Sequence, residues 1–387
     1  MKIAPFGVEQ WMNEWETGAV TNLAETCVDS MTMEELLDIS DASGTSGARE
    51  EIVERMMKLR LSYGDILGSD ELLESIASMY GRAGRGNVMV MNGGSAANFI
   101  SLYTMIEPGD EVVCAYPTYQ QLYSIPESFG ASVKLLRLRY ENGFKPDVDE
   151  LKGMISDRTK AICVNNSNNP TGTVMSQSEL REIARAAESV NAWLYCDEAY
   201  RFMVHDQSAE IPSAFDLCER AVVTCGLSKC FSLAGLRLGW VVAPEGFINE
   251  AACRRDYTTI SCGRLDDLLG CVAIKNRGRI FERNLSIVRG CAAMLDEWVN
   301  SERRIDYVKP EAGTTAFLRY DYEIGSEDFC RGLYRKDGTF LLPGACFGPE
   351  FDRYLRIGYA YSPDVLEEGL RRVSGFLRDL DEEAGPN

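Results

Sequence analysis

The stretch 224-TCGLSKCFSLAGLRLGW-240 carries one lysine, Lys229, in a turn of small residues between two apolar segments. A strand is predicted over 221–225, and a second strand over 236–243. Lys229 therefore lies at a strand end, where the functional sites of α/β proteins gather. Taken alone, a lysine in such a turn is most simply a solvated loop residue. Its interpretation depends on companion residues elsewhere in the chain.

Strand-like apolar runs and helical patterns alternate along most of the sequence. This alternation predicts the α/β class, with a large domain whose mostly parallel sheet is wrapped by helices, plus a smaller α+β domain. Helical spacing then continues from 266 to 301, as in one long helix that connects two domains. The predicted helices cover 8–18, 33–37, 49–60 and 177–188, and the other predicted strands cover 87–91, 111–115, 132–138, 161–165 and 193–196.

The composition argues against several classes of function. A formal net charge of -19 disfavours nucleic acids and anionic membranes as partners, since both would repel the surface. His205 is the only histidine, which leaves little room for histidine metal sites or for Ser-His and Cys-His catalysis, and we expect no metal. The 13 cysteines are scattered without a CxxC pair, and neither a signal peptide nor a membrane-spanning apolar run is visible. We therefore expect a reduced, cytoplasmic protein.

Two motifs with glycine or aromatic residues follow predicted strands. In 91-MNGGSAA-97 a glycine pair precedes a helix start, where free backbone N–H groups and the helix dipole bind a phosphate. A simple tight turn explains this motif about as well. Tyr119, in 116-YPTY-119, could stack on a flat cofactor ring, although core packing is the more common role of a tyrosine there.

Two polar motifs follow the next pair of strands. The amides of 165-NNSNNPTG-172 cannot continue a strand and are costly to bury unpaired, so we expect a turn that offers a donor from Asn169 to an oxygen. Asp197 directly follows an apolar strand, and a carboxylate at that depth needs a cation. A helix N-cap is an equally good explanation of Asp197 in isolation. Tyr200, three residues on, can reach the same site.

Lys229 and its neighbours complete a pocket suited to an aromatic aldehyde phosphate. A lysine in a partly dry site loses its proton more easily and can form a Schiff base with an aldehyde. Ser228 and Arg237 can bind the phosphate, the arginine through its planar fork.

In the order and spacing of these motifs, from Tyr63 to Arg356, the chain resembles the fold-type I, aspartate-aminotransferase-like family of pyridoxal-phosphate enzymes. The resemblance implies pyridoxal 5'-phosphate as cofactor, amino acids and 2-oxo acids as substrates, and a homodimer with shared active sites. It also implies three parts: an N-terminal arm at 1–45 that belongs to the small domain and serves as a substrate lid, a large cofactor-binding domain at 46–275, and a small C-terminal domain at 276–387.

The resemblance implies catalytic roles for three residues. Lys229 resembles the Schiff-base lysine, which also moves the proton between the substrate Cα and the cofactor. Asp197 resembles the partner that keeps the pyridine nitrogen protonated. Tyr200 and Asn169 resemble the two donors to the ring 3-oxygen, and Tyr119 the stacking aromatic. The residues that resemble the phosphate cup are Gly94, Ser95, Ala96, Ser228 and Arg237, joined by Tyr63 of the neighbouring subunit.

The resemblance also implies substrate contacts, with two departures from the family. Arg356, in 354-YLRIG-358, matches the arginine that binds the substrate α-carboxylate, assisted by Asn169; taken alone it would be a surface residue. Gly226 stands where the family often has serine or threonine. The lid segment, glycine-rich in many relatives, here has the sequence 22-NLAETCVDS-30.

The acidic lid leads to a hypothesis about the substrate. We expect Glu25, Asp29 or Glu16 to face the pocket and to favour a cationic side chain such as that of arginine or lysine, by charge complementarity. A solvated loop charge is the simpler explanation of these residues.

The function expected from the resemblance is transfer of an amino group from an L-amino acid to a 2-oxo acid through a Lys229 Schiff base. A lyase, cyclase or oxidase/deaminase that acts on an amino acid, including a cationic one such as arginine, would use the same motifs. A ligand sensor related to DNA-binding regulators is disfavoured by the acidity of the chain. A Rossmann oxidoreductase is disfavoured because GxGxxG is absent after the strand at 87–91.

Overall fold

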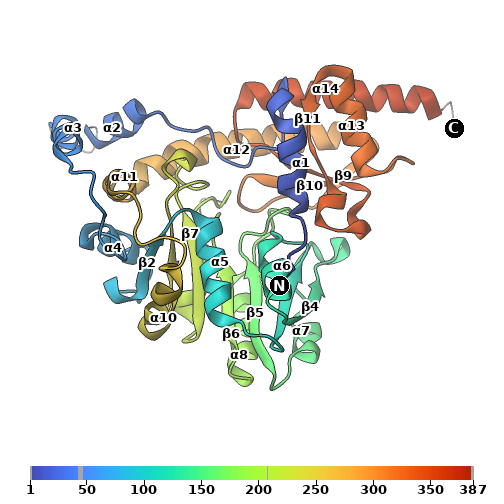
Figure 1. The fold of residues 1–387 in the computed structure, drawn as a ribbon. Helices are drawn as coiled ribbons and strands as arrows, with labels where there is room; N and C mark the ends of the chain where they lie inside the picture. Colours follow the sequence, from blue (N-terminus) through green and yellow to red (C-terminus); the bar gives the residue numbers. More distant parts are fainter. Residues whose placement is uncertain (1, 42–46, 207, 385–387) are drawn as a thin grey trace.

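A central sheet of seven strands runs through the part of the chain that the structure describes (Figure 1). This computed structural model describes residues 2–41, 47–206 and 208–384. The pairs β3–β4, β3–β5, β5–β6 and β6–β7 are parallel, and β8 is antiparallel to both neighbours, so the predicted mostly parallel sheet is confirmed. In sheet order the strands are β2 (Val88–Met91), β8 (Gly239–Val242), β7 (Ala221–Gly226), β6 (Trp193–Asp197), β5 (Thr159–Asn165), β3 (Glu111–Tyr116) and β4 (Ser132–Arg137).

Both faces of this sheet are covered, as its continuous apolar runs require. Successive side chains of a strand point to opposite faces. In β2, Val88 and Val90 accordingly join one buried core, while Met89 and Met91 join the other. The second core also takes side chains from α5 (Gly94–Met105), α6 (Gln121–Ser128) and α10 (Glu245–Arg255), and the first from α4 (Asp70–Ala77), α8 (Gln177–Ser189) and α11 (Arg264–Lys275).

The predicted strands match the observed ones to within one or two residues, except for the last. The strand predicted over 236–243 is observed only over Gly239–Val242. Ala234–Leu236 instead forms a 3-10 turn, and Arg237 adopts a left-handed backbone with φ 48°. The turn brings the Arg237 side chain back towards Gly93, which an extended strand would not do.

The predicted helices are confirmed as α1 (Gly7–Trp15), α2 (Met33–Asp41), α3 (Ala48–Lys58) and α8, but the single long helix over 266–301 is wrong. Two helices occupy this stretch, α11 and α12 (Arg277–Ser301), and they meet at Asn276, where ψ is 14°. The Asn276 side chain donates to the Val272 carbonyl at 2.9 Å and so competes with the helical backbone.

The C-terminal third contains a smaller antiparallel sheet, which the N-terminus joins through a separate pair of strands. Strand β1 (Thr21–Asn22) pairs in parallel with β11 (Thr339–Phe340), and Figure 1 shows α1, in blue, among the orange and red C-terminal elements. The division into domains stays a prediction, and its boundary near residue 45 falls in 42–46, outside the described residues. The smaller sheet has the order β12 (Leu342–Pro343), β13 (Tyr354–Gly358), β10 (Thr315–Tyr320) and β9 (Ile305–Tyr307), and it is flanked by α12, α13 (Ser326–Asp337) and α14 (Pro363–Ala384).

Residues 22–31, which we call the N-terminal strap, cross between the two sheets as an irregular segment. Backbone bonds attach the strap at several points: Gly358 N–H donates to the Leu23 carbonyl at 2.7 Å, and Met31 N–H donates to the Ser232 carbonyl at 3.1 Å. The Thr314 hydroxyl donates to the Thr26 carbonyl at 2.6 Å. The strap is therefore fixed to both the large and the small sheet regions.

All 13 cysteines are free thiols, as predicted from their scattered positions. In the described ranges, no helix combines the length and the apolar composition needed to cross a membrane. The cytoplasmic location stays a prediction.

Replacing Gly358 with alanine is expected to destabilise the protein, because an added Cβ would lie 1.8 Å from the Glu25 carbonyl oxygen of the strap. We expect a loss of about 1–3 kcal/mol, as for other overpacked sites, measured by denaturant unfolding. The control is Gly290→Ala in α12, where an added Cβ meets nothing within 4 Å and should raise stability by about 0.5–1 kcal/mol. Wild-type stability in Gly358→Ala would contradict this packing of the strap.

Candidate active site

A cavity of about 560 Å³ opens at the carboxyl ends of β5, β6 and β7, within the range of about 300–1,000 Å³ that small-ligand sites occupy. The strap, α1 and the start of α5 close its other sides. Most of the predicted site residues line it: Glu25, Gly94, Ser95, Tyr119, Asn169, Asp197, Tyr200, Ser228, Lys229, Arg237 and Arg356. Ala96 and Tyr63 are not among the lining residues.

Lys229 lies at the floor of the cavity with its amine turned towards the strap. Its Nζ donates to Thr26 Oγ1 at 2.6 Å and contacts Cys27 Sγ at 3.5 Å. Burial lowers the pKa of Lys229, but Cys27, Tyr200 and Glu25 raise it, and the net shift is upward. The groups around Lys229 therefore oppose the effect of burial, and the sequence did not show how many acidic groups surround this lysine.

Asp197 ends β6 and is almost completely buried. Its Oδ2 accepts from Asn98 Nδ2 at 2.9 Å, and its Oδ1 accepts from the Ala199 N–H at 3.0 Å. Burial raises the pKa of Asp197 above its usual value, while Asn98, Ala199 and the charge of Lys229 oppose the shift. The carboxylate has no ion-pair partner among the described residues, so it is available to a cationic group in the cavity.

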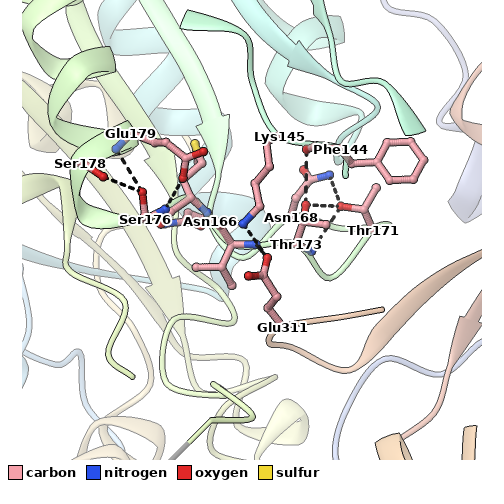
Figure 2. A network of polar contacts seen from close by, with 12 residues as sticks. Phe144, Lys145, Asn166, Asn168, Thr171, Thr173, Ser176, Ser178, Glu179 and Glu311 are labelled. Carbon is pink, nitrogen blue, oxygen red and sulfur yellow. Dashed lines mark hydrogen bonds and ion pairs between the residues drawn. The ribbon is translucent and has the colours of Figure 1, made fainter. Parts of the chain in front are cut away.

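The asparagine-rich turn after β5 is held by its own side chains, as Figure 2 shows for Asn166, Asn168, Thr171 and Thr173. Asn168 Nδ2 donates to Thr171 Oγ1 at 2.9 Å, and Asn166 Nδ2 donates to the Met175 carbonyl at 3.3 Å. Asn169 is not used in this way: it lines the cavity, and its buried Oδ1 has no partner. The Nδ2 groups of Asn166 and Asn168 thus hold the turn, and Asn168 Oδ1, like Asn169 Oδ1, has no partner. Of Asn168 and Asn169, only Asn169 lines the cavity.

Small residues and one arginine form a cradle at the start of α5. The first backbone N–H groups of a helix have no partner within the helix, and nothing lies within 4 Å of a Cβ added at Gly94. Gly93 has φ 87°, and Arg237 Nη2 would lie 2.7 Å from a Cβ placed there. A Cβ at Gly226 would lie 3.0 Å from the Leu238 carbonyl oxygen and 3.5 Å from the Gly94 nitrogen. Glycine at 226 therefore lets β7 approach the helix start closely, and this arrangement suits an anion such as a phosphate.

Arg356, on β13, brings a buried positive charge to the opposite wall. Its Nη2 donates to the Ala24 carbonyl at 2.8 Å, while its buried Nε has no partner. Burial lowers the pKa of Arg356, opposed by Tyr200 and Glu25. Within the described residues Arg356 forms no ion pair with a carboxylate, so a carboxylate in the cavity would satisfy both its charge and its free N–H.

Three carboxylates from the N-terminal segment face the cavity: Glu9, Glu16 and Glu25. Glu25 Oε1 accepts from the N–H groups of Thr26 and Cys27, each at 2.7 Å, and thereby shapes the strap. Glu9 Oε1 accepts from the Tyr119 hydroxyl at 3.3 Å.

Burial raises the pKa of Glu16, and although its bond from Asn22 opposes this shift, Glu25 and Glu9 add to it. Asp29, in contrast, pairs with Arg283 at 3.1 Å and is not among the residues that line the cavity.

The lining residues that were missed from the sequence include Glu9, Thr26, Cys27 and Asn98. The first three lie far along the chain from Lys229, and no local pattern marks them. Asn98 did carry a signal, because it lies one helical turn after Gly94 and so shares its face of α5.

Two predicted site residues lie outside the cavity. Tyr63 is 80% exposed, and its contact with another subunit stays a prediction. Ala96 is in the first turn of α5, where only its backbone N–H can serve an anion. In the described ranges no group of three or more His, Cys, Asp or Glu residues could hold a metal.

The donor set fits pyridoxal 5'-phosphate. The cradle at Gly94 and Arg237 would hold the phosphate, Lys229 would meet the aldehyde, and Asp197 would face the ring nitrogen. The Asn169 side chain makes no hydrogen bond to a described residue, so its Nδ2 would be free to donate to the ring oxygen.

Comparison with known proteins agrees with this donor set. Residues 37–373 match the model of the family "Aminotransferase class I and II". The chain is 33% identical to a capreomycidine synthase of Streptomyces vinaceus over 96% of this chain and 93% of that protein. It is 28% identical to an aspartate aminotransferase of Pyrococcus horikoshii over 75% of each protein.

A crystal structure described as a PLP-dependent aminotransferase from Streptococcus suis has a TM-score of 0.93 and 38% identity, and the match covers 98% of this chain and 99% of that one. The chain therefore belongs to the aminotransferase class I and II family and is a fold-type I, pyridoxal phosphate-dependent enzyme.

Proposed function

We propose that this enzyme transfers an amino group from an L-amino acid to a 2-oxo acid. The observation that carries the proposal is the placement of Lys229 and Asp197 at the ends of neighbouring strands, with Arg356 across the same cavity. An aminotransferase needs a movable base, an anchor for the cofactor ring and a site for the α-carboxylate, and this cavity offers all three.

Each residue has a distinct role in the proposed reaction. When bound, pyridoxal phosphate supplies an aldehyde that takes the substrate amine and a ring that withdraws electrons from the substrate Cα. Asp197 holds a proton on the ring nitrogen, Tyr200 and Asn169 donate to the ring oxygen, and Tyr119 packs against the ring face. Arg356 orients the substrate through its α-carboxylate.

Lys229 is the proposed acid and base. Its amine takes the proton from the substrate Cα, and the acidic groups that raise its pKa help it to hold that proton. The Thr26 hydroxyl lies 2.6 Å from Nζ and accepts a hydrogen bond from the amine. This bond would hold the amine in position after it takes the proton and before it passes the proton on. The strap excludes water above it, which limits loss of the proton to solvent.

We propose an amino donor with a cationic side chain. Glu9 and Glu16 supply negative charge on the α1 side of the cavity. Repulsion from Glu9 contributes to the raised pKa of Glu16. A cationic side chain bound between the two carboxylates would relieve this repulsion. Glu25 contributes charge to the same site, but two backbone N–H groups already occupy its Oε1.

A cyclase that acts on such an amino acid is the second candidate. It is favoured by the likeness to a capreomycidine synthase, which is 33% identical over 96% of this chain. A cyclase would use the same Lys229, Asp197 and Arg356, so the residues described above are common to both candidates.

We also propose a homodimer with shared sites. Met57, Leu61 and Tyr63 are 80% exposed or more, and Tyr257 is 91% exposed. Arg255 links the two segments that carry them, since its Nη2 donates to the Ile66 and Ile260 carbonyls. An apolar surface of this kind is typical of an interface, and Tyr63 within it would reach the phosphate of the partner.

The reaction class is tested with ¹⁵N-labelled amino acids and a panel of unlabelled 2-oxo acids, followed by mass spectrometry. We expect ¹⁵N to appear in a new amino acid derived from the 2-oxo acid. Lys229→Ala should lower turnover by about 10³-fold or more, because it removes the base, whereas Lys152→Ala on the surface should not. Ammonia release would instead identify elimination, and a cyclic product that keeps its amino nitrogen after expulsion of a side-chain substituent would identify cyclisation.

The substrate class is tested by Glu16→Gln. Removing this charge should lower kcat/KM for arginine by about tenfold while leaving that for a neutral amino acid within about twofold, since only the cation loses an attraction. Glu14→Gln, an exposed neighbour on α1, is the matched control. An equal effect on both substrates would show that Glu16 does not select for charge.

The shared site is tested by mixing two inactive variants, Lys229→Ala and Tyr63→Ala. A mixed dimer has one site that combines an intact Lys229 with an intact Tyr63, so random exchange should restore about a quarter of the wild-type activity. Each variant alone should remain far less active. If activity does not recover although subunit exchange is proven, Tyr63 acts in the active site of its own subunit or in no active site.

A further inference from the structure

Asn98 lies at the centre of a buried polar cluster behind Asp197. The residue is 2% exposed and projects from α5 between β6 and β7. Its Nδ2 donates to Asp197 Oδ2 at 2.9 Å and to Gln121 Oε1 at 3.1 Å. Its Oδ1 accepts from the Tyr195 hydroxyl and from the Thr224 hydroxyl, both at 2.7 Å. All four hydrogen-bonding positions of the amide are therefore in use.

The two hydroxyl groups fix which way this amide points. If the amide were turned over, its oxygen would face the Asp197 carboxylate, and the aspartate would have to carry a proton to bond with it. The hydroxyls would then have to accept from the amide and to find other acceptors for their own hydrogens. Tyr195 could use Thr224 at 3.1 Å, but the described residues offer the Thr224 hydroxyl no further acceptor. One buried hydrogen would be left unpaired, at a cost that the observed orientation avoids.

The observed orientation has a consequence for Asp197. Each of its oxygens faces an N–H donor, from Asn98 or from Ala199, and a donor requires a lone pair rather than a proton. A proton on Asp197 would have to point away from both donors, so the two N–H groups favour the carboxylate form.

We propose that Asn98 is a positioning residue, oriented by Tyr195 and Thr224, that holds Asp197 as a carboxylate acceptor aimed into the cavity. The proposal rests on the assigned role of Asp197 as partner of the cofactor ring nitrogen. It adds three residues, on α5, β6 and β7, to the machinery of the site.

The surroundings of Asp197 make such a device necessary. Burial raises its pKa, and the titratable groups that face it are Lys229, Tyr119, Tyr195 and Cys196. Burial raises the pKa of Tyr119 to about 12, and also raises those of Tyr195 and Cys196 well above their usual values, so these three are neutral at physiological pH. Lys229 alone supplies positive charge, and it does so only while its amine is free and protonated.

The test is Asn98→Asp, which keeps the shape of the side chain and replaces the donor to Asp197 with a second carboxyl group. Two carboxyls in contact share a proton, so one of the pair should stay protonated at pH 7. Burial raises the pKa of Glu198 to about 7, so the wild type already contributes a carboxylic acid signal near neutral pH. Infrared spectra of the full-length protein without cofactor should then show, at pH 7, an additional carboxylic acid band in the variant. The variant should also bind pyridoxal phosphate about tenfold more weakly or worse, since one pKa unit corresponds to a factor of ten.

Asn87→Asp is the matched control, because the Asn87 amide is likewise hydrogen-bonded, to the Ala243 carbonyl, but lies away from the cavity and from Asp197. It should leave both the spectrum and cofactor affinity unchanged. If Asn98→Asp fails to fold, Tyr195→Phe provides the test instead. This substitution removes only one donor to Asn98, so it should raise the pKa of Asp197 by a smaller amount than Asn98→Asp does.

An Asn98→Asp protein with no more protonated carboxyl at pH 7 than the wild type, and with wild-type cofactor affinity, would overturn the proposal, as would an unchanged Asp197 titration in Tyr195→Phe. Because these measurements use no substrate, they are independent of whether the reaction is transamination or cyclisation.

Discussion

The pairing of parallel strands β6 and β7 is the constraint on which the site depends. Their register sets Asp197 beside Thr224, so the aspartate and the turn that carries Lys229 emerge at the same edge of the sheet. Neither charge is stable at that depth alone, because burial opposes both charged forms. The cavity between them therefore favours a molecule over water if that molecule places a cationic ring nitrogen near Asp197 and an electrophilic carbon near Lys229.

The N-terminal strap turns this cofactor site into a selective one. It contacts Lys229 through Thr26, covers Arg356 through the Ala24 carbonyl and carries Glu25. Because its backbone is bonded to Gly358, Ser232 and Thr314, these contacts have fixed positions. The same chain segment thus contacts both Lys229 and Arg356 and carries a carboxylate that lines the cavity.

The sequence predicted the fold well wherever local patterning decides it. Apolar runs located six strands of the large sheet because both of its faces are buried, and the glycine, asparagine and aspartate motifs at their ends were correctly expected to meet. It failed where a tertiary contact overrides the pattern: at Asn276, whose side chain interrupts a helical repeat, and at Arg237, whose left-handed backbone shortens β8. The direction of the Lys229 pKa shift could not be predicted from the sequence, because Glu25 and Cys27 lie some 200 residues away from Lys229 along the chain.

The central claim is that Lys229 carries pyridoxal phosphate in the cavity that it shares with Asp197. The most direct measurement is to add the cofactor to the purified protein, fix it with borohydride and map the modified peptide by mass spectrometry. This account predicts one phosphopyridoxyl group per chain, on Lys229, and loss of that group's tight binding in Asp197→Ala. Labelling of a different lysine, or tight binding that is indifferent to Asp197, would contradict it.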